Sequence, residues 1–467
     1  MILRKQILLI AWCLIAAGVL NVSSQNADSL TLERVIDMAV KNSASLNARQ
    51  KGLSAASART SQAKGAYFPV VNGTASYANI GPIEKMNFPV AVGIKPDPVT
   101  GRDGLVMQNI PFQLYPGNNW DIHIGADYLL YDFGRRKKTV ELSAIGEQGV
   151  QTGAVLDAKG IAYLAIIMFE SIMNSDHMIK AKNEDVSNLS QHLEFVRKKL
   201  STGSATQFDV LRSEVQLMNS QTDLTNLAND RDKQQIDFRQ TTGLPETAPV
   251  ILKGAFDSSY QELSSDTLVA QALKNRTEID LLNIAVKALQ AQIALAKADL
   301  LPALSAHASV GEKNGYVPDL DKLQLNWVMG GQLQVPIFDG RRSHFRTREL
   351  ESRIDSLQIM LKDVKDRMRT EVLKAIADVK SAHQNFIAAK TNVGLAGESR
   401  RIANLQYEAG VIPNLDLLDA EDKFIQAKFA QLQSEFRYAL SRYALMRVTG
   451  FDFTELSKGA EKNDRRR

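Results

Sequence analysis

The sequence has few of the residues on which catalytic and cofactor sites depend. Its 467 residues include one cysteine and six histidines. No His-Glu-x-x-His pair and no glycine-rich phosphate-binding loop occurs, and the histidines do not fall at the spacing of metal ligands. These absences predict that the protein is not an enzyme and that it has no cofactor and no metal site.

Long hydrophobic runs are also scarce. The run Ile7–Leu20 follows two basic residues and precedes small residues, which is the pattern of a secretory signal peptide over residues 1–24. No later segment approaches the ~20 uninterrupted apolar residues of a membrane-spanning helix. Cys13 lies within this leader, and the bulky Trp12 before it argues against a lipid attachment site. The chain is therefore expected to be exported, and its mature part to form no disulfide.

The charge is nearly balanced. A formal net charge of +4 is too small to indicate a nucleic-acid partner. Hydrophobic residues at 44% and charged residues at 23% are typical of an ordered protein. An exported, ordered chain of this kind is either soluble in the periplasm or part of an outer-membrane barrel.

One pattern occurs twice along the chain. Ala39-Val40-Lys41-Asn42 corresponds to Ala272-Leu273-Lys274-Asn275, and the same spacing relates Pro69 to Pro302. A second constant spacing relates Gly203 to Gly410, Asp209 to Asp416, Leu211 to Leu418, Glu214 to Glu421 and Gly243 to Gly450. We interpret the chain as a duplication with repeats at 25–245 and 246–453, followed by a flexible tail at 454–467.

Each repeat is predicted to run helix, strand, strand, very long helix, helix. The two long helices are expected at 135–200 and 341–407, and each would be about 100 Å long. Shorter helices are expected at 31–66, 207–242, 267–300 and 414–449, with tip turns at 201–207 and 408–414. Steps of four and three, typical of a coiled-coil seam, relate Leu350, Ile354, Leu357, Leu361, Val364 and Met368.

Four strands are expected from alternating apolar and polar residues. They are placed at about 68–79, 120–131, 302–311 and 326–338. Between Trp120 and Leu130, apolar side chains alternate with Asp121, His123, Gly125 and Asp127. Segments of ~10 residues with one apolar face suit a membrane β-barrel, although a soluble sheet with one wet face has the same pattern.

Aromatic residues near the strand ends fit the girdles of a membrane barrel, namely Tyr67, Phe68, Tyr77, Tyr131, Phe133 and Phe338. Four strands cannot enclose an aqueous lumen, so several subunits would have to share one barrel. The segment from Asn79 to Asn119 contains six prolines. Its composition predicts a loop, and its length suits an extracellular cap.

The strand-to-helix turns and the tip turns together resemble those of the TolC family of outer-membrane efflux proteins. The strand-to-helix turns are Tyr131-Asp132-Phe133-Gly134-Arg135 and Pro336-Ile337-Phe338-Asp339-Gly340-Arg341, and the tip turns are Gly203-x5-Asp209-Val210-Leu211 and Gly410-x5-Asp416-Leu417-Leu418-Asp419-Ala420. The resemblance covers nearly all of the mature chain. It departs from the family's pattern only in the long first loop.

This resemblance implies a mostly α fold with a β-barrel portion. Three subunits of four strands each would form a 12-stranded barrel in outer-membrane lipid, continued by an α-helical tunnel through the periplasm. The implied partners are two further subunits, a periplasmic adaptor (membrane fusion) protein and an inner-membrane pump of the RND or ABC type. The chain would conduct substrates passively, in efflux or type I secretion.

Two acids follow the second tip turn. Asp416 and Asp419 are three residues apart, so both can face the same way on a helix. The resemblance implies that they form rings of carboxylates at the tunnel constriction, where acids favour cations. The alternative is that acids in a first helical turn stabilise the helix dipole. Asp209 is the counterpart of Asp416 in the first repeat. The residue of the first repeat that corresponds to Asp419 is Arg212.

Three further residues are expected to act at the tip. Tyr407 could donate a hydrogen bond to Asp209 in a closed state. Gly203 and Gly410 are expected in left-handed conformations that end the long helices. The same turns could dock the adaptor. At the other end of the long helices, Asp132 and Asp339 are expected to cap them.

Two other functions compete with the channel. A soluble periplasmic coiled-coil tether or adaptor would explain the heptads, but it would not explain the two pairs of alternating strands. An exported enzyme would need a reactive cluster of side chains, which the sequence does not contain.

Overall fold

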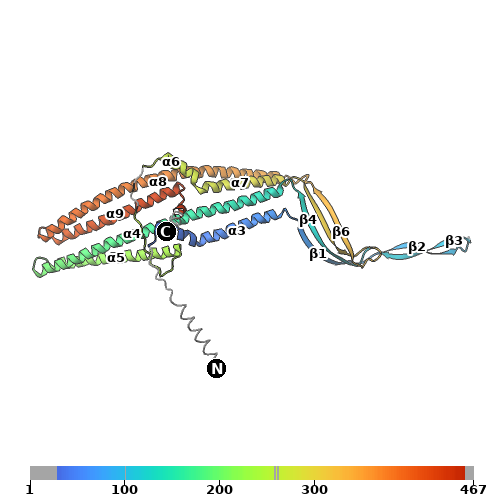
Figure 1. The fold of residues 1–467 in the computed structure, drawn as a ribbon, viewed down its shortest axis with the longest axis horizontal. Helices are drawn as coiled ribbons and strands as arrows, with labels where there is room; N and C mark the ends of the chain where they lie inside the picture. Colours follow the sequence, from blue (N-terminus) through green and yellow to red (C-terminus); the bar gives the residue numbers. More distant parts are fainter. Residues whose placement is uncertain (1–28, 100, 257–258, 260–261, 458–467) are drawn as a thin grey trace, which may run out of the picture. The chain divides into compact units, whose positions relative to one another are not determined.

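The computed structural model describes residues 29–99, 101–256, 259 and 262–457 (Figure 1). The predicted signal peptide with Cys13, and residues 458–467 of the predicted tail, lie outside these residues. The chain forms two compact units. The helical unit takes in the described residues up to Lys51, Gln151–Leu281 and those from Leu361 onward, and the strand unit takes in Gly52–Val150 and Leu282–Met360.

The helical unit is made of two long helices and their shorter partners. The long helices are α4 (Arg135–Ser201) and α8 (Arg342–Glu408). The part of α4 up to Val150 and the part of α8 up to Met360 belong to the strand unit. The returning helices are α5 (Gln207–Thr242) and α9 (Asn414–Val448). These bounds agree with the predicted helices to within one residue at each end.

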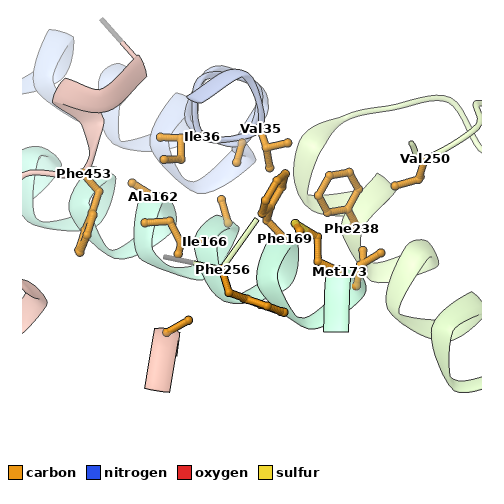
Figure 2. Packing of buried hydrophobic residues seen from close by; sticks show 14 residues of the cluster. Val35, Ile36, Ala162, Ile166, Phe169, Met173, Phe238, Val250, Phe256 and Phe453 are labelled. Carbon is orange, nitrogen blue, oxygen red and sulfur yellow. The ribbon is translucent and has the colours of Figure 1, made fainter. Parts of the chain in front are cut away.

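The main core of the helical unit lies where α2 (Leu32–Asn42), α4, α5 and α9 meet. Val35 and Ile36 of α2 pack against Ile166 and Phe169 of α4, and Phe238 of α5 closes the group (Figure 2). Burying a side chain of this size is worth about 1.5–3 kcal/mol. Among the described helices, α4 and α7 (Thr277–Ala298) are apolar enough by length and composition to cross a membrane. For α4, the apolar residues from Ala162 to Met173 contribute to this core.

The strand unit contains a four-stranded antiparallel sheet in the order β1-β4-β5-β6. Its strands are β1 (Val70–Asn79), β4 (Asn118–Tyr131), β5 (Ala303–Lys313) and β6 (Gln324–Gln334). The register pairs Ser76 with Asp121, and Asp127 with His307. Both β1 and β6 are edge strands, so each has one side without a strand partner within the described chain. The predicted strand at 326–338 is shorter in the structure, since it ends at Gln334.

Two strands occur where the sequence analysis predicted a loop. β2 (Lys85–Pro96) and β3 (Asp103–Gln113) pair with each other in a separate two-stranded ribbon. The prediction rested on the prolines of this segment, but proline is tolerated in a ribbon whose strands are both edges. The alternating apolar residues that favour the strand form are Met86, Phe88, Val90, Val92 and Ile94.

The helices predicted at 31–66 and 267–300 are each two helices in the structure. The first consists of α2 and α3 (Ala44–Gly65), and the second of α6 (Ser265–Asn275) and α7. The breaks occupy equivalent places in the two repeats, at Ser43 and Arg276, which have extended backbones. Asn42, beside the first break, donates a hydrogen bond of 2.6 Å to the carbonyl oxygen of Thr242.

A glycine lies against each break. Gly243 has a φ of 72°, and a Cβ on it would lie 2.7 Å from Asn42 Nδ2. Gly450 has a φ of 83°, and its Cβ would lie 2.9 Å from Asn275. Both the left-handed backbone and the close approach therefore require glycine at these matched positions. Beyond Gly450, residues 454–457 of the predicted tail are helical, because Phe453 and Leu456 pack into the main core.

Candidate functional site

The tip of the helical unit is formed by the turns between α4 and α5 and between α8 and α9. Gly203 and Gly410 have φ values of 75° and 74°, which confirms the predicted left-handed conformation. The amide of Ser204 donates to Lys199 O at 2.8 Å, and that of Val411 donates to Gln406 O at 2.8 Å. In each case the residue after the glycine donates to a carbonyl oxygen in the last turn of the long helix. Both long helices therefore end with the same hydrogen-bond pattern.

Asp209 caps the helix in which it lies. Its carboxylate accepts hydrogen bonds from the Thr206 backbone amide at 2.9 Å and from the Thr206 hydroxyl at 2.7 Å. The Asp209 amide donates in return to Thr206 Oγ1, which completes a capping box. Arg212 is exposed in the next turn. The side chain of Asp209 is therefore held at the start of α5.

Asp416 and Asp419 differ from Asp209 in their surroundings. Pro413 occupies the cap position of α9 and offers no side-chain cap. Both carboxylates are exposed, whereas Leu417 and Leu418 between them are buried. The two acids therefore project from one helix on its solvent side, and neither caps the helix in the described structure. Their predicted role in a constriction stays a prediction.

Tyr407 is buried at the end of α8, with 6% of its surface exposed. Lys199 of α4 donates to the carbonyl oxygen of Tyr407 at 2.7 Å and lies 4.2 Å from the centre of its ring. Burial, and secondarily the negative charge of Asp209, raise the pKa of the Tyr407 hydroxyl. The hydrogen bonds found among the described residues do not include one between Tyr407 and Asp209, so that bond remains a prediction for another state.

A buried polar network, which the sequence analysis missed, connects the two helical hairpins. His192 Nε2 of α4 and Asn414 Oδ1 of α9 lie 2.7 Å apart. The amide nitrogen of Asn414 donates to Asp209 O and to Ser213 Oγ of α5, both at 3.2 Å. Since this nitrogen is the donor, Asn414 Oδ1 is the acceptor and His192 donates from Nε2. The exposed fractions of Asn414 and Ser213 are only 2% and 1%.

Apolar packing surrounds this network. Leu193 and Val196 of α4, Val210 of α5 and Leu417 of α9 form one buried cluster with Tyr407. Burial lowers the pKa of His192, and the nearby Lys199 lowers it further, although the bond to Asn414 partly opposes both. His192 is therefore neutral at pH 7. No sequence signal pointed to His192 and Asn414, because the two residues are far apart in the chain and belong to no motif.

In the strand unit, the four-stranded sheet has one apolar and one polar face. Large apolar side chains on one face are exposed, among them Trp120 (44%), Ile124 (61%), Trp327 (69%) and Met329 (76%). The rings of Tyr77 and Trp120 lie 4.6 Å apart on this face, near the end of β1. An exposed apolar surface of this kind marks a contact with a membrane or with another protein.

The opposite face carries hydrogen-bonded polar groups. His307 Nδ1 and Asp127 Oδ1 lie 2.8 Å apart across β5 and β4, and His123 Nδ1 lies 2.8 Å from Asp121 Oδ1. Lys313 Nζ lies 3.5 Å from the other oxygen of Asp121. A sheet with a lipid-compatible face and a charged face has the two surfaces that the wall of a water-filled membrane barrel requires.

The first turns of the long helices are capped as predicted. The carboxylate of Asp132 accepts from the amides of Gly134 at 3.2 Å and Arg136 at 2.8 Å. That of Asp339 accepts from the amide of Ser343 at 2.8 Å. Hydrogen bonds from the side chain of Ser343, and then from its backbone amide, hold the pKa of the Asp339 carboxyl below its ordinary range.

Comparison with known proteins points to one family. The family model described as outer membrane efflux protein matches residues 268–451. The chain is 20% identical over 442 residues to the outer membrane efflux protein BepC of Brucella suis, a match that covers 94% of this chain and 90% of BepC. It is 24% identical to the alkaline protease secretion protein AprF of Pseudomonas aeruginosa, over 54% of this chain and 53% of AprF.

The fold agrees with solved outer-membrane channels. The structure superimposes on the Campylobacter jejuni CmeC outer membrane channel with a TM-score of 0.71 and 17% identity. That match covers 92% of this chain and 88% of CmeC. The helical hairpins and the four-stranded sheet thus occur together in known channels of this architecture.

Proposed function

The chain belongs to the family of outer membrane efflux proteins, and from that premise we propose that it is one subunit of a trimeric channel. The channel lies in the outer membrane and extends into the periplasm. It conducts substrates passively to the exterior after an inner-membrane pump of the RND or ABC type and a periplasmic adaptor deliver them. Its own residues carry out no chemistry.

The sheet of the strand unit is the observation that carries this proposal. One of its faces is apolar and exposed, the other is charged, and both edge strands lack a partner within the described chain. Unpaired edges at membrane depth are costly, so the sheet must be completed by other copies. Three copies supply twelve strands, which is enough to surround a water-filled lumen. A soluble tether would have no use for the apolar face.

The tip of the helical unit supports a gate at the periplasmic end. The network from His192 through Asn414 to Ser213 connects the hairpin of α4 and α5 to that of α8 and α9. Breaking it leaves buried polar groups unpaired, which costs about 1–3 kcal/mol for each group. We propose that this network, with Lys199 on Tyr407, holds the two hairpins together in the closed state.

The exposed acids of the tip are the proposed selectivity element. Among the described residues, neither the Asp416 nor the Asp419 carboxylate has a hydrogen-bond partner that would neutralise it. Their charges are therefore available to passing ions. In a trimer they would form two rings, and Asp209 would add a third charge near the start of α5. Gly203 and Gly410 mark the exposed turns that we propose for adaptor docking.

Single-channel conductance in planar bilayers tests the proposal. The variant Asp416→Asn/Asp419→Asn keeps the shape of both side chains and their capacity to cap a helix, but removes six charges per trimer. We expect discrete openings in both proteins and a weaker preference for cations in the variant. Asp230→Asn/Asp232→Asn, on the exposed side of α5 and far from the turn, is the matched control.

The outcomes separate the parts of the proposal. An unchanged ion preference in the variant would leave Asp416 and Asp419 as ordinary solvent-exposed acids near the start of α9. Recovery of the folded protein in the soluble periplasm, without openings in any bilayer, would support the tether and overturn the channel.

A further inference from the structure

Two histidine–aspartate pairs lie together on the polar face of the sheet, and the proposed function does not use them. His123 and Asp121 belong to β4, while His307 of β5 is directly opposite Asp127 of β4. In each pair the histidine Nδ1 lies 2.8 Å from a carboxylate oxygen. The side chains of His123 and His307 are 30% and 45% exposed, so both rings are accessible to solvent on this face.

The two rings border the same open space. Gly125 lies between His123 and Asp127 on β4 and has no side chain. A Cβ placed on Gly125 would lie 3.6 Å from His307 Cε1 and 3.8 Å from His123 Cδ2. Each of these ring carbons is bonded to Nε2 of its histidine, so each Nε2 lies one bond away from an atom that borders the space above Gly125.

The carboxylates determine which nitrogen of each ring is available. When a neutral histidine donates its Nδ1 proton to a carboxylate, Nε2 keeps a lone pair and can accept a metal ion. This carboxylate–histidine arrangement is the usual second shell of protein metal sites, where it orients the ring and makes the ligand more basic. Asp121 also lies near Lys313, which neutralises part of its charge.

We propose that Nε2 of His123 and Nε2 of His307 bind a divalent first-row transition-metal ion above Gly125. Imidazole nitrogen is a preferred ligand of zinc, copper and nickel ions, and water completes the coordination. Across the residues that the structure describes, no group of three or more His, Cys, Asp and Glu side chains could hold a metal ion. The site therefore has two protein ligands and binds weakly, which suits an ion that must also leave.

The location of this site in the channel rests on the proposed function, because only the assembled barrel turns the polar face toward a lumen. The binding itself does not depend on that assembly. In the trimer three such sites would line one level of the lumen. Spacing along the chain could not reveal them, since strand pairing brings together two histidines that lie in different repeats.

Equilibrium dialysis of Ni²⁺ against the purified full-length protein tests the site. The protein is prepared without a histidine tag, at pH 7.5, with excess Mg²⁺ to occupy isolated carboxylates. We expect one Ni²⁺ per subunit in the wild type. His123→Asn and His307→Asn should each weaken binding by at least tenfold, because both ligands are needed. Asp121→Asn and Asp127→Asn should weaken it by about 10- to 100-fold through loss of the second shell.

Two control variants should bind Ni²⁺ as the wild type does. Glu312→Gln removes a carboxylate from the opposite face of β5, and His344→Asn removes a histidine from α8. Failure of the wild type to bind Ni²⁺ would overturn the proposal and leave two ordinary hydrogen-bonded pairs. So would binding that survives His123→Asn or His307→Asn.

Conductance then tests the position of the site separately. If the site lines the lumen, Ni²⁺ should reduce the current through the wild type and not through the His123→Asn/His307→Asn variant. Binding in dialysis without any channel openings would uphold the metal site and overturn the proposed function. Channel openings without Ni²⁺ binding would uphold the proposed function and overturn the metal site.

Discussion

The replacement Glu170→Gln is expected to raise the free energy of unfolding of the helical unit at pH 8 and to change it much less at pH 5. Glu170 lies on α4 in the main core, with 4% of its surface exposed. One carboxylate oxygen, Oε2, has no hydrogen-bond partner among the described residues. Burial raises the pKa of Glu170 from its ordinary 4.5 to about 7, although a hydrogen bond with Tyr443 partly opposes the shift.

The magnitude follows from proton linkage. Because the folded state holds the proton more tightly than the unfolded state, stability falls as pH rises from 4.5 to about 7. Each pKa unit corresponds to about 1.4 kcal/mol, so the ionised group costs about 3 kcal/mol per subunit above pH 7. At pH 5 most of this cost is absent. The increase in the free energy of unfolding caused by Glu170→Gln should therefore be larger at pH 8 than at pH 5 by roughly 2–3 kcal/mol.

Urea unfolding in detergent, followed by circular dichroism at 222 nm, measures this difference. Comparing one variant at two pH values removes any cost of placing an amide in the core, since that cost does not depend on pH. Glu184→Gln, an exposed acid on the same helix, serves as the control and should show no such dependence. If Glu170→Gln shifted stability equally at both pH values, the reasoning about its buried charge would be wrong.

Three further predictions concern the tip. Burial lowers the pKa of His192 in the packed tip, so acid favours the state in which the network is broken and the ring is hydrated. Wild-type open probability should therefore rise at pH 5.5, while His192→Gln should respond little to pH and Asn414→Leu should open more at every pH. Gly410→Ala should destabilise the helical unit by about 1 kcal/mol in urea unfolding because of its positive φ, whereas Gly394→Ala, inside α8 with open space around it, should not. Thr206→Ala should cost about 1 kcal/mol through loss of the α5 cap, seen as faster amide exchange confined to the first turn of that helix.

The long helices were predictable because their signals are local. Heptad spacing over α8 and a matched repeat in the first half placed the helices to within one residue at each end. The barrel strands were predictable from alternation, and the solved channels of the same fold agree with that architecture. The loop prediction for residues 79–119 was wrong because it gave the prolines more weight than the alternating apolar residues of β2.

The candidate site was only partly predictable. Asp416 and the tip glycines stand at repeated positions, and Asp419 belongs to the second tip-turn motif, so the sequence patterns predicted them. His192, Asn414 and Ser213 do not, since their relation exists only after α4, α5 and α9 have packed together. The same holds for Glu170, whose raised pKa results from burial and not from its neighbours in the chain.

The sequence by itself determined the duplication, the order and length of the long and returning helices, and the two-faced character of the four sheet strands, because periodicity and turn chemistry act over a few residues. The tertiary structure alone decided which polar groups meet. Pairing β4 with β5 brought His123 and His307 to either side of Gly125, and packing two hairpins enclosed the network of Asn414. Contacts between residues two hundred positions apart depend on register and packing geometry, which local patterns do not contain.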